Sequence, residues 1–212
     1  VRDSQLTGNY AGETGGAIYG ERDIALVNTQ ILNNTAERGN GGGVFTLGPL
    51  RVTAGTIQDN QAKGSGAQPG SGFGGGLYIS GTLSLENVNI FRNLAGSFGG
   101  GVYQRGKAAA VTVANSHFER NEGKAAGALS TEGPLTLRSS QLLNNRANFY
   151  GGALYAINHV TLAESTVSGN VAGIIGGGAF FHSNFGQGVT VTVDKVKFTG
   201  NQANGMRTYD EG

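Results

Sequence analysis

The sequence of 212 residues has no cysteine, no tryptophan, only three prolines and almost no excess charge. The lack of cysteine excludes disulfide bonds, thiolate metal sites and cysteine nucleophiles. Basic and acidic residues number 15 and 14, so the totals give no electrostatic signature of nucleic-acid binding, and we expect no nucleic-acid partner. No run of 18 apolar residues occurs, so we predict no transmembrane segment.

Glycine, in contrast, is abundant, with 39 residues in the chain. This is more than twice the ordinary share of about 7%, and it lacks the strict period of three that marks collagen. Glycine at this density must serve particular positions of a fold. A search for internal repeats therefore comes before any assignment of individual elements.

An apolar residue followed three positions later by asparagine occurs eight times in the chain. The asparagines are Asn9, Asn34, Asn60, Asn93, Asn121, Asn145, Asn170 and Asn201. Their apolar partners are Leu6, Ile31, Ile57, Ile90, Phe118, Leu142, Val167 and Phe198. The intervals between successive asparagines are 25, 26, 33, 28, 24, 25 and 31, which indicates a basal unit of about 25 residues with insertions.

Two further landmarks keep the same register. An apolar-x-apolar segment such as Leu135 and Leu137 lies five positions before the apolar partner of the asparagine, and its period of two predicts a strand. A glycine pair or Gly-Ala, followed by an apolar residue, precedes each such segment. An aromatic residue follows in six of seven repeats, at Tyr19, Phe45, Tyr78, Tyr103, Tyr155 and Phe180. Ser130 occupies that position in the remaining repeat.

These spacings predict an all-β fold, a single-stranded parallel β-helix or solenoid of about eight coils of roughly 25 residues. A unit this short buries its apolar face only against copies of itself, about 4.8 Å apart. We expect one domain over residues 1–212, with insertions at 63–73, 104–110 and 181–188 on its surface. Val1 stands at the second apolar position of a strand, which suggests a segment of a longer chain.

The asparagines are predicted to form a structural ladder. Stacked side-chain amides bond to one another and satisfy backbone groups where a coil turns, and asparagine tolerates the left-handed conformation that such turns need. A second polar column is expected from the hydroxyl groups of Thr29, Ser116, Ser140 and Ser165. Small residues two positions after each asparagine, such as Ala147, indicate a tight interior corner.

The sequences GGAI at 15–18 and GGAL at 151–154, with the pairs Phe118/Asn121 and Phe198/Asn201, carry a family resemblance. The repeat resembles that of the chlamydial polymorphic membrane proteins, which are autotransporter passengers, and related bacterial and archaeal surface proteins. The resemblance covers nearly the whole chain. It implies a right-handed parallel β-helix, secretion to the cell surface and commonly a role in adhesion.

The aromatic column is the candidate binding stripe. Its members alternate with inward apolar residues, so most of them are predicted to face outward, where they could bind a glycan or a partner protein. Stacked aromatic residues also stabilise strand ladders, which is the simpler interpretation. A row of hydroxyls that includes Thr112, Thr136 and Thr161 is similar to those of ice-binding solenoids, although threonine favours strands anyway.

No catalytic, metal or cofactor site is predicted. Carbohydrate-active β-helices need clustered carboxylates, or a carboxylate with Arg or Lys, on one face. Here no column stacks two acids, and an acid in one coil falls beside a base in the next, as with Asp59 and Arg92, which is what a solvated charge ladder prefers. The three histidines, His117, His159 and His182, belong to different columns. We therefore expect no enzyme.

The leading hypothesis is a non-enzymatic extracellular or cell-surface β-helix that acts as a stalk, adhesin or filament subunit. Its expected partners are a glycan, a host or neighbouring-cell surface protein, or further copies joined through open solenoid ends. The alternative is a polysaccharide lyase or hydrolase acting beside one of the insertions.

Overall fold

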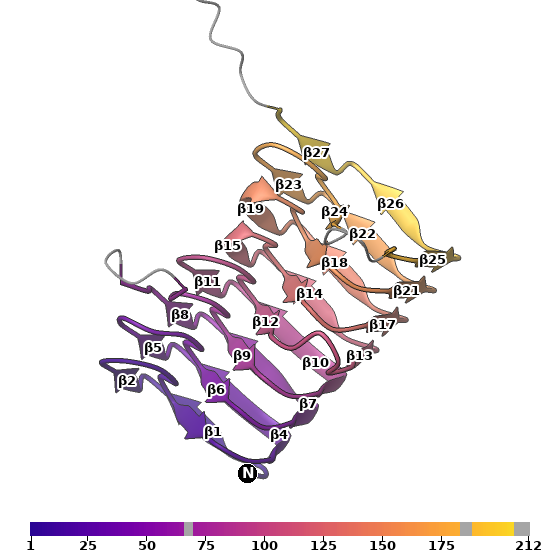
Figure 1. Cartoon of the computed structure of the whole chain (residues 1–212). Coiled ribbons are helices and arrows are strands. Elements are labelled where there is room, and N and C mark those ends of the chain that lie inside the picture. Colours follow the sequence, from indigo (N-terminus) through magenta and orange to yellow (C-terminus); the bar gives the residue numbers. More distant parts are fainter. Residues whose placement is uncertain (66–69, 183–187, 206–212) are drawn as a thin grey trace, which may run out of the picture.

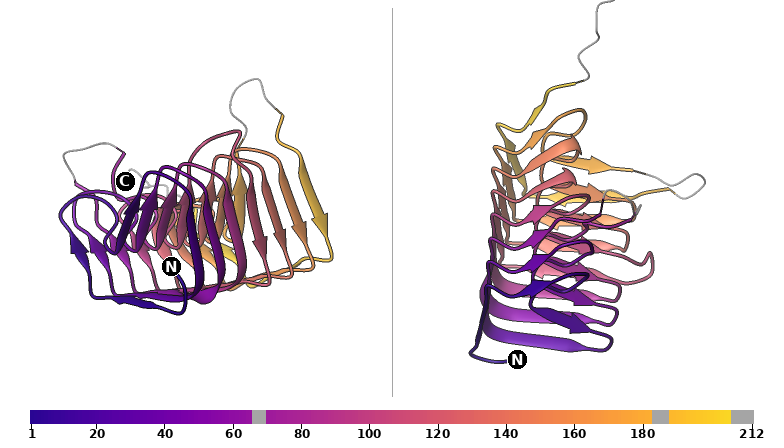
Figure 2. Two further views of the ribbon diagram at one scale, coloured as in Figure 1. Left: turned by 90° about the horizontal axis from the view of Figure 1, so that it is seen from below. Right: turned by 90° about the vertical axis from the view of Figure 1, so that its left-hand side faces the viewer.

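The computed structural model of the chain describes residues 1–65, 70–182 and 188–205. This described part is all-β, without helix, and its strands form three parallel sheets of 12, 8 and 7 strands. Figures 1 and 2 show successive turns of the chain stacked along one axis, so that strands from neighbouring repeats lie side by side. The fold is thus a parallel β-solenoid of about seven turns, with the sheets as its walls.

The largest sheet contains the apolar-x-apolar segments. Its strands are β1 (Gln5–Thr7), β4 (Ile24–Leu32), β7 (Leu50–Gln58), β10 (Leu83–Phe91), β13 (Val111–Ala114), β14 (His117–Glu119), β17 (Leu135–Arg138), β18 (Gln141–Leu143), β21 (Val160–Ala163), β22 (Thr166–Ser168), β25 (Val191–Asp194) and β26 (Lys197–Thr199). Early turns cross this sheet as one bent strand, and later turns as two. The bend has a residue with positive φ, for example Asn28 at 47° and Asn115 at 49°.

Two sheets of short strands complete the walls. The eight-stranded sheet follows the asparagines and consists of β2 (Tyr10–Ala11), β5 (Thr35–Ala36), β8 (Gln61–Ala62), β11 (Leu94–Ala95), β15 (Glu122–Ala125), β19 (Arg146–Tyr150), β23 (Val171–Ala172) and β27 (Gln202–Ala203). The seven-stranded sheet follows the glycine pairs and consists of β3 (Ile18–Gly20), β6 (Val44–Thr46), β9 (Leu77–Ile79), β12 (Val102–Gln104), β16 (Leu129–Thr131), β20 (Leu154–Ala156) and β24 (Ala179–Phe181).

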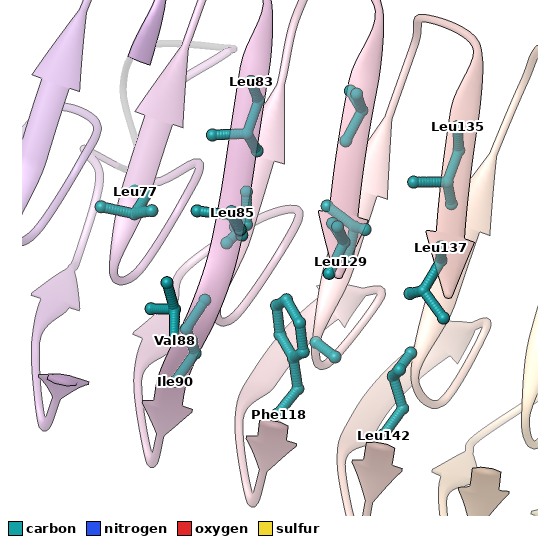
Figure 3. Packing of buried hydrophobic residues seen from close by; sticks show 14 of the residues in the cluster. Leu77, Leu83, Leu85, Val88, Ile90, Phe118, Leu129, Leu135, Leu137 and Leu142 are labelled. Atoms are coloured by element: carbon teal, nitrogen blue, oxygen red, sulfur yellow. The ribbon is translucent and has the colours of Figure 1, made fainter. Parts of the chain in front are cut away.

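The register of the sheets places equivalent residues of neighbouring repeats opposite each other. Leu83 pairs with Val111, Val111 with Leu135, and Leu135 with Val160. Because successive strand residues point to opposite faces, the alternating apolar residues all turn inward. Figure 3 shows such side chains, among them Phe118 and Leu135, gathered between the walls. Each of these is at most 2% exposed, so the interior is one continuous apolar core.

The corner at the glycine pairs brings backbone against backbone. A Cβ atom built on Gly100 would lie 2.4 Å from the carbonyl oxygens of both Glu122 and Gly127. Positive φ falls one residue earlier, at 67° for Gly99 and 61° for Gly151. The first glycine therefore supplies the turn and the second permits the close approach.

The predicted insertions lie between strands of different sheets. Residues 63–73 connect β8 to β9, 104–110 connect β12 to β13, and 181–188 connect β24 to β25. Of the first insertion, residues 66–69 lie outside the described part of the chain, as do residues 183–187 of the third. The second is described throughout, and its Gln104 is buried, with its side-chain carbonyl accepting hydrogen bonds from Thr131 and Gly133.

Candidate functional site

The eight asparagines form one hydrogen-bonded ladder along the solenoid. From Asn9 to Asn201, the Nδ2 of each donates to the Oδ1 of the next at 2.8–3.0 Å. The same Oδ1 accepts the backbone N–H of the preceding asparagine, as between Asn121 and Asn145 at 3.0 Å. Asn34, Asn60, Asn93, Asn121, Asn145 and Asn170 are at most 1% exposed.

The second Nδ2 proton explains the spacing of three between the apolar residue and the asparagine. The Nδ2 of Asn121 donates to the backbone oxygen of Ile90 at 2.8 Å, and that of Asn145 to Phe118 at 3.1 Å. Each acceptor is the apolar residue that precedes the previous asparagine. The apolar-x-x-Asn pattern thus joins two turns through main-chain and side-chain bonds and leaves the interior amide groups no capacity for a ligand.

The left-handed residues of this corner are not the asparagines themselves, contrary to expectation. Positive φ occurs one residue earlier, at 8, 33, 59, 92, 120, 144, 169 and 200, which includes Arg92 at 49° and Arg120 at 54°. The ladder asparagine must direct its amide inward, so its neighbour takes the turn. The hydroxyl column forms a shorter second ladder, in which the backbone N–H of Ser116 donates to Ser140 Oγ at 3.1 Å.

The aromatic column does not face outward as predicted, except at one end. Tyr19 is 53% exposed, whereas Phe45, Tyr78 and Tyr103 are buried, and Tyr155 and Phe180 are half-buried. The first four rings stack in order along the solenoid. Their ring centroids are separated by 5.3 Å for Tyr19–Phe45, 4.7 Å for Phe45–Tyr78 and 5.4 Å for Tyr78–Tyr103.

A second column of side chains covers these rings. It is made of the residue before each glycine pair, and Phe73 and Phe98 from it pack against the buried rings. The Phe73 ring lies 4.7 Å from that of Tyr103. The sequence carries a signal for this column in GFGG at 72–75 and SFGG at 97–100, where the residue before the glycine pair is aromatic, but the repeat pattern above begins at the glycine and leaves this residue out.

Both columns are interrupted in the same turn. Ser130 pairs in register with Tyr103 on one side and Tyr155 on the other. Ala125 likewise stands between Phe98 and Tyr150. A cavity of about 330 Å³ lies at the Ser130 interruption, lined by Phe73, Phe98, Tyr103, Ser130, Thr131, Glu132, Tyr155, Ile157 and His182. It combines aromatic walls with polar groups and is the candidate site.

Hydrogen bonds hold Glu132 at the edge of this cavity. Tyr103 donates its phenol proton to Glu132 Oε1 at 2.7 Å, and the backbone N–H of Gly106 donates to Oε2 at 3.0 Å. Burial, and then this bond to Glu132, raises the pKa of Tyr103 well above its usual value. Burial also raises the pKa of Tyr155. Both phenols therefore remain protonated donors at neutral pH.

Charged side chains elsewhere pair between turns. Arg92 makes a double contact with Asp59, from Nε to Oδ1 and from Nη2 to Oδ2, each at 2.8 Å. The Arg92 guanidinium lowers the pKa of the Asp59 carboxyl. Lys63 lies 2.8 Å from Glu37 in the same manner. Each pair joins an acid in one turn to a base in the next, as the sequence predicted.

Within residues 1–65, 70–182 and 188–205, no group of three or more histidine, aspartate or glutamate side chains is arranged to hold a metal ion. In the same part of the chain, no helix has the length and apolarity required to cross a bilayer.

Comparison with known proteins agrees with the repeat. Residues 3–21 match the Chlamydia polymorphic membrane protein repeat family. The "Probable outer membrane protein pmp7" of Chlamydia pneumoniae is 28% identical over 197 residues, which cover 82% of this chain and 21% of that protein, so the chain spans about a fifth of its relative. No solved structure matches. The GGA[IL] and FxxN repeats of this chain thus resemble those of the chlamydial polymorphic membrane proteins, as the sequence predicted.

Proposed function

We propose that this chain is a non-enzymatic segment of a cell-surface protein, in which the solenoid acts as a stalk that presents an adhesive surface. The observation that carries the proposal is the asparagine ladder, in which the buried side-chain amides bond to one another and hold neighbouring turns together. The similarity to a protein named as a probable outer membrane protein supports the location. We infer a right-handed coil of eight repeats, because parallel crossovers are nearly always right-handed.

Surface labelling tests the location. Antibodies raised against the purified chain should label intact cells of the source organism, and external protease should remove the signal. A cytosolic protein probed in the same cells serves as the control for intactness. Labelling that requires permeabilised cells would contradict the proposal.

Adhesion is tested with the purified chain itself. Beads coated with the folded chain should bind host or neighbouring cells more than beads coated with an unfolded variant of equal length. Release of reducing ends from polysaccharides by the chain would instead support the lyase or hydrolase alternative. Self-association into filaments stays a prediction, which electron microscopy at increasing concentration would test.

A further inference from the structure

We propose that the cavity beside Ser130 binds one pyranose ring of a saccharide. This proposal deepens the adhesive role above by naming the site and the ligand class. Ser130 takes the place of an aromatic ring in the stacked column. Elsewhere in the column the ring centroids of aromatic neighbours lie 4.7–5.7 Å apart, and at Ser130 the corresponding position between Tyr103 and Tyr155 holds only a small side chain.

The walls of the cavity suit a flat, partly apolar ligand. The Phe98 ring leans across the interrupted turn and meets both tyrosines edge-on, with centroids 6.5 Å from Tyr103 and 5.8 Å from Tyr155. Aromatic faces carry partial negative charge, and the C–H groups on one face of a pyranose carry partial positive charge, so the two attract. The volume of about 330 Å³ is at the small end of ligand sites and suits one ring.

The base of the cavity demands a polar ligand. Ser130 is 2% exposed, and across residues 1–65, 70–182 and 188–205 its hydroxyl forms no hydrogen bond, although it lines the cavity. This hydroxyl is not among the fully buried unpaired atoms, so it is open to the cavity, and a ligand that fills the cavity must replace the water it would otherwise bond. An apolar side chain from a partner protein would leave it unpaired, whereas a sugar hydroxyl would pair with it.

Glu132, two residues after Ser130, supplies a fixed acceptor to the cavity. Both oxygens of Glu132 already accept one bond each, from Tyr103 and Gly106, and each retains a free lone pair. These bonds orient the carboxylate before a ligand arrives, which reduces the entropic cost of binding. Aromatic walls with a few fixed polar groups are the usual composition of small-molecule sites.

Titration of the purified chain tests the proposal. The probes are the methyl glycosides of glucose, galactose and N-acetylglucosamine, followed by saturation-transfer NMR and by tyrosine fluorescence, which tryptophan does not obscure here. We expect at least one glycoside to bind with a Kd of about 1 mM, as suits a ligand of this size. Silence of all three at 50-fold higher concentration overturns the proposal.

Variants locate the binding. Tyr155→Ala removes a wall and should weaken binding about tenfold or more, and Ser130→Ala should weaken it about two- to tenfold through loss of one hydrogen bond. Tyr19→Ala, a matched change in the same column but outside the cavity, should bind as the original chain does. Circular dichroism checks that each variant folds. Equal binding by Ser130→Ala and the original chain, with Tyr155→Ala also unaffected, overturns the assignment.

A probe with an aromatic ring and no hydroxyl group tests whether the cavity instead binds a protein side chain. N-acetyl-phenylalaninamide should not compete with the bound glycoside. If this probe binds at the cavity and the glycosides do not, the site takes a protein side chain and the saccharide proposal is wrong. These titrations use the isolated chain, so their failure is separate from failure of surface labelling on cells.

Discussion

Each interior asparagine of the ladder makes three kinds of hydrogen bond, which neither aspartate nor serine can combine. Its Oδ1 accepts two bonds, one Nδ2 proton continues the ladder, and the other closes onto a backbone oxygen, as at Asn121. Aspartate lacks the donors and serine lacks the reach. At this scale, the regular spacing of asparagine in the sequence follows from the hydrogen bonds that each turn needs.

Asn121→Ala tests this requirement. It leaves the Asn93 amide groups, the Ile90 oxygen and the Asn145 oxygen short of partners inside the core, so we expect a loss of about 3 kcal/mol or more in unfolding free energy. Urea denaturation measures it. Asn9→Ala is the matched control, since Asn9 is exposed and its Oδ1 accepts no bond among the described residues, and it should cost about 1 kcal/mol or less. Equal losses would contradict the ladder's energetic role.

The ion pair between Asp59 and Arg92 predicts a pH dependence. Arg92 lowers the folded-state pKa of Asp59 below its ordinary 3.8, so the stabilisation is present above that value and disappears as the pH falls through the lower folded-state pKa. Asp59→Asn should therefore destabilise at pH 7 by at most about 1 kcal/mol, as is usual for an exposed pair, and by less at pH 3. Urea midpoints at both pH values measure this. A difference that grows in acid would refute the assignment.

At the scale of the element, the glycine corner limits what each turn tolerates. Backbone atoms of neighbouring turns approach the second glycine directly, so an added side chain has no flexible neighbour to displace. The three insertions lie in loops, one before a glycine pair and two between the seven-stranded and the 12-stranded sheet. Sequence variation in such a solenoid should therefore avoid the second glycine and collect in these loops.

Gly100→Ala tests the corner. The added methyl would meet backbone oxygens at 2.4 Å on two sides, so we expect a loss of about 3 kcal/mol or more and failure to fold at 37 °C. Gly12→Ala is the control, because its nearest outside atom is the Arg38 guanidinium at 3.9 Å and its φ is not positive. That change should be neutral or slightly stabilising. Thermal melts followed by circular dichroism compare the two.

At the scale of the whole molecule, the turns are stacked along one axis, so the free energy of unfolding depends on each turn and on its contacts with its neighbours. In the sheets each turn pairs with its immediate neighbours, and the contacts that span two turns, such as Phe98 with Tyr155 and Asn158 with Lys107, involve side chains. Stability should then be a sum of repeat and interface contributions. A turn can be removed without altering the kind of contact made by the rest.

Deletion of residues 146–170 tests this additivity. The segment spans the 25 positions between Asn145 and Asn170, so Val171 would follow Asn145 as it now follows Asn170. We expect a folded solenoid shortened by one turn, with a lower urea midpoint. Deletion of residues 146–157 removes half a turn, places apolar residues on the wrong face and should abolish cooperative unfolding. A folded half-turn variant would argue against a strict register.

The sequence determined the period, the strand register and the asparagine ladder, because these follow from spacing along the chain. Only the tertiary structure decided which aromatic side chains are buried. Phe73 and Phe98 belong to a corner whose direction depends on packing, and they cover Tyr78 and Tyr103, which alternation alone placed outside. The cavity beside Ser130 has the same origin, since Phe98 of the neighbouring column leans against Tyr155 where the aromatic column is interrupted, and only packing reveals that the two columns adjoin.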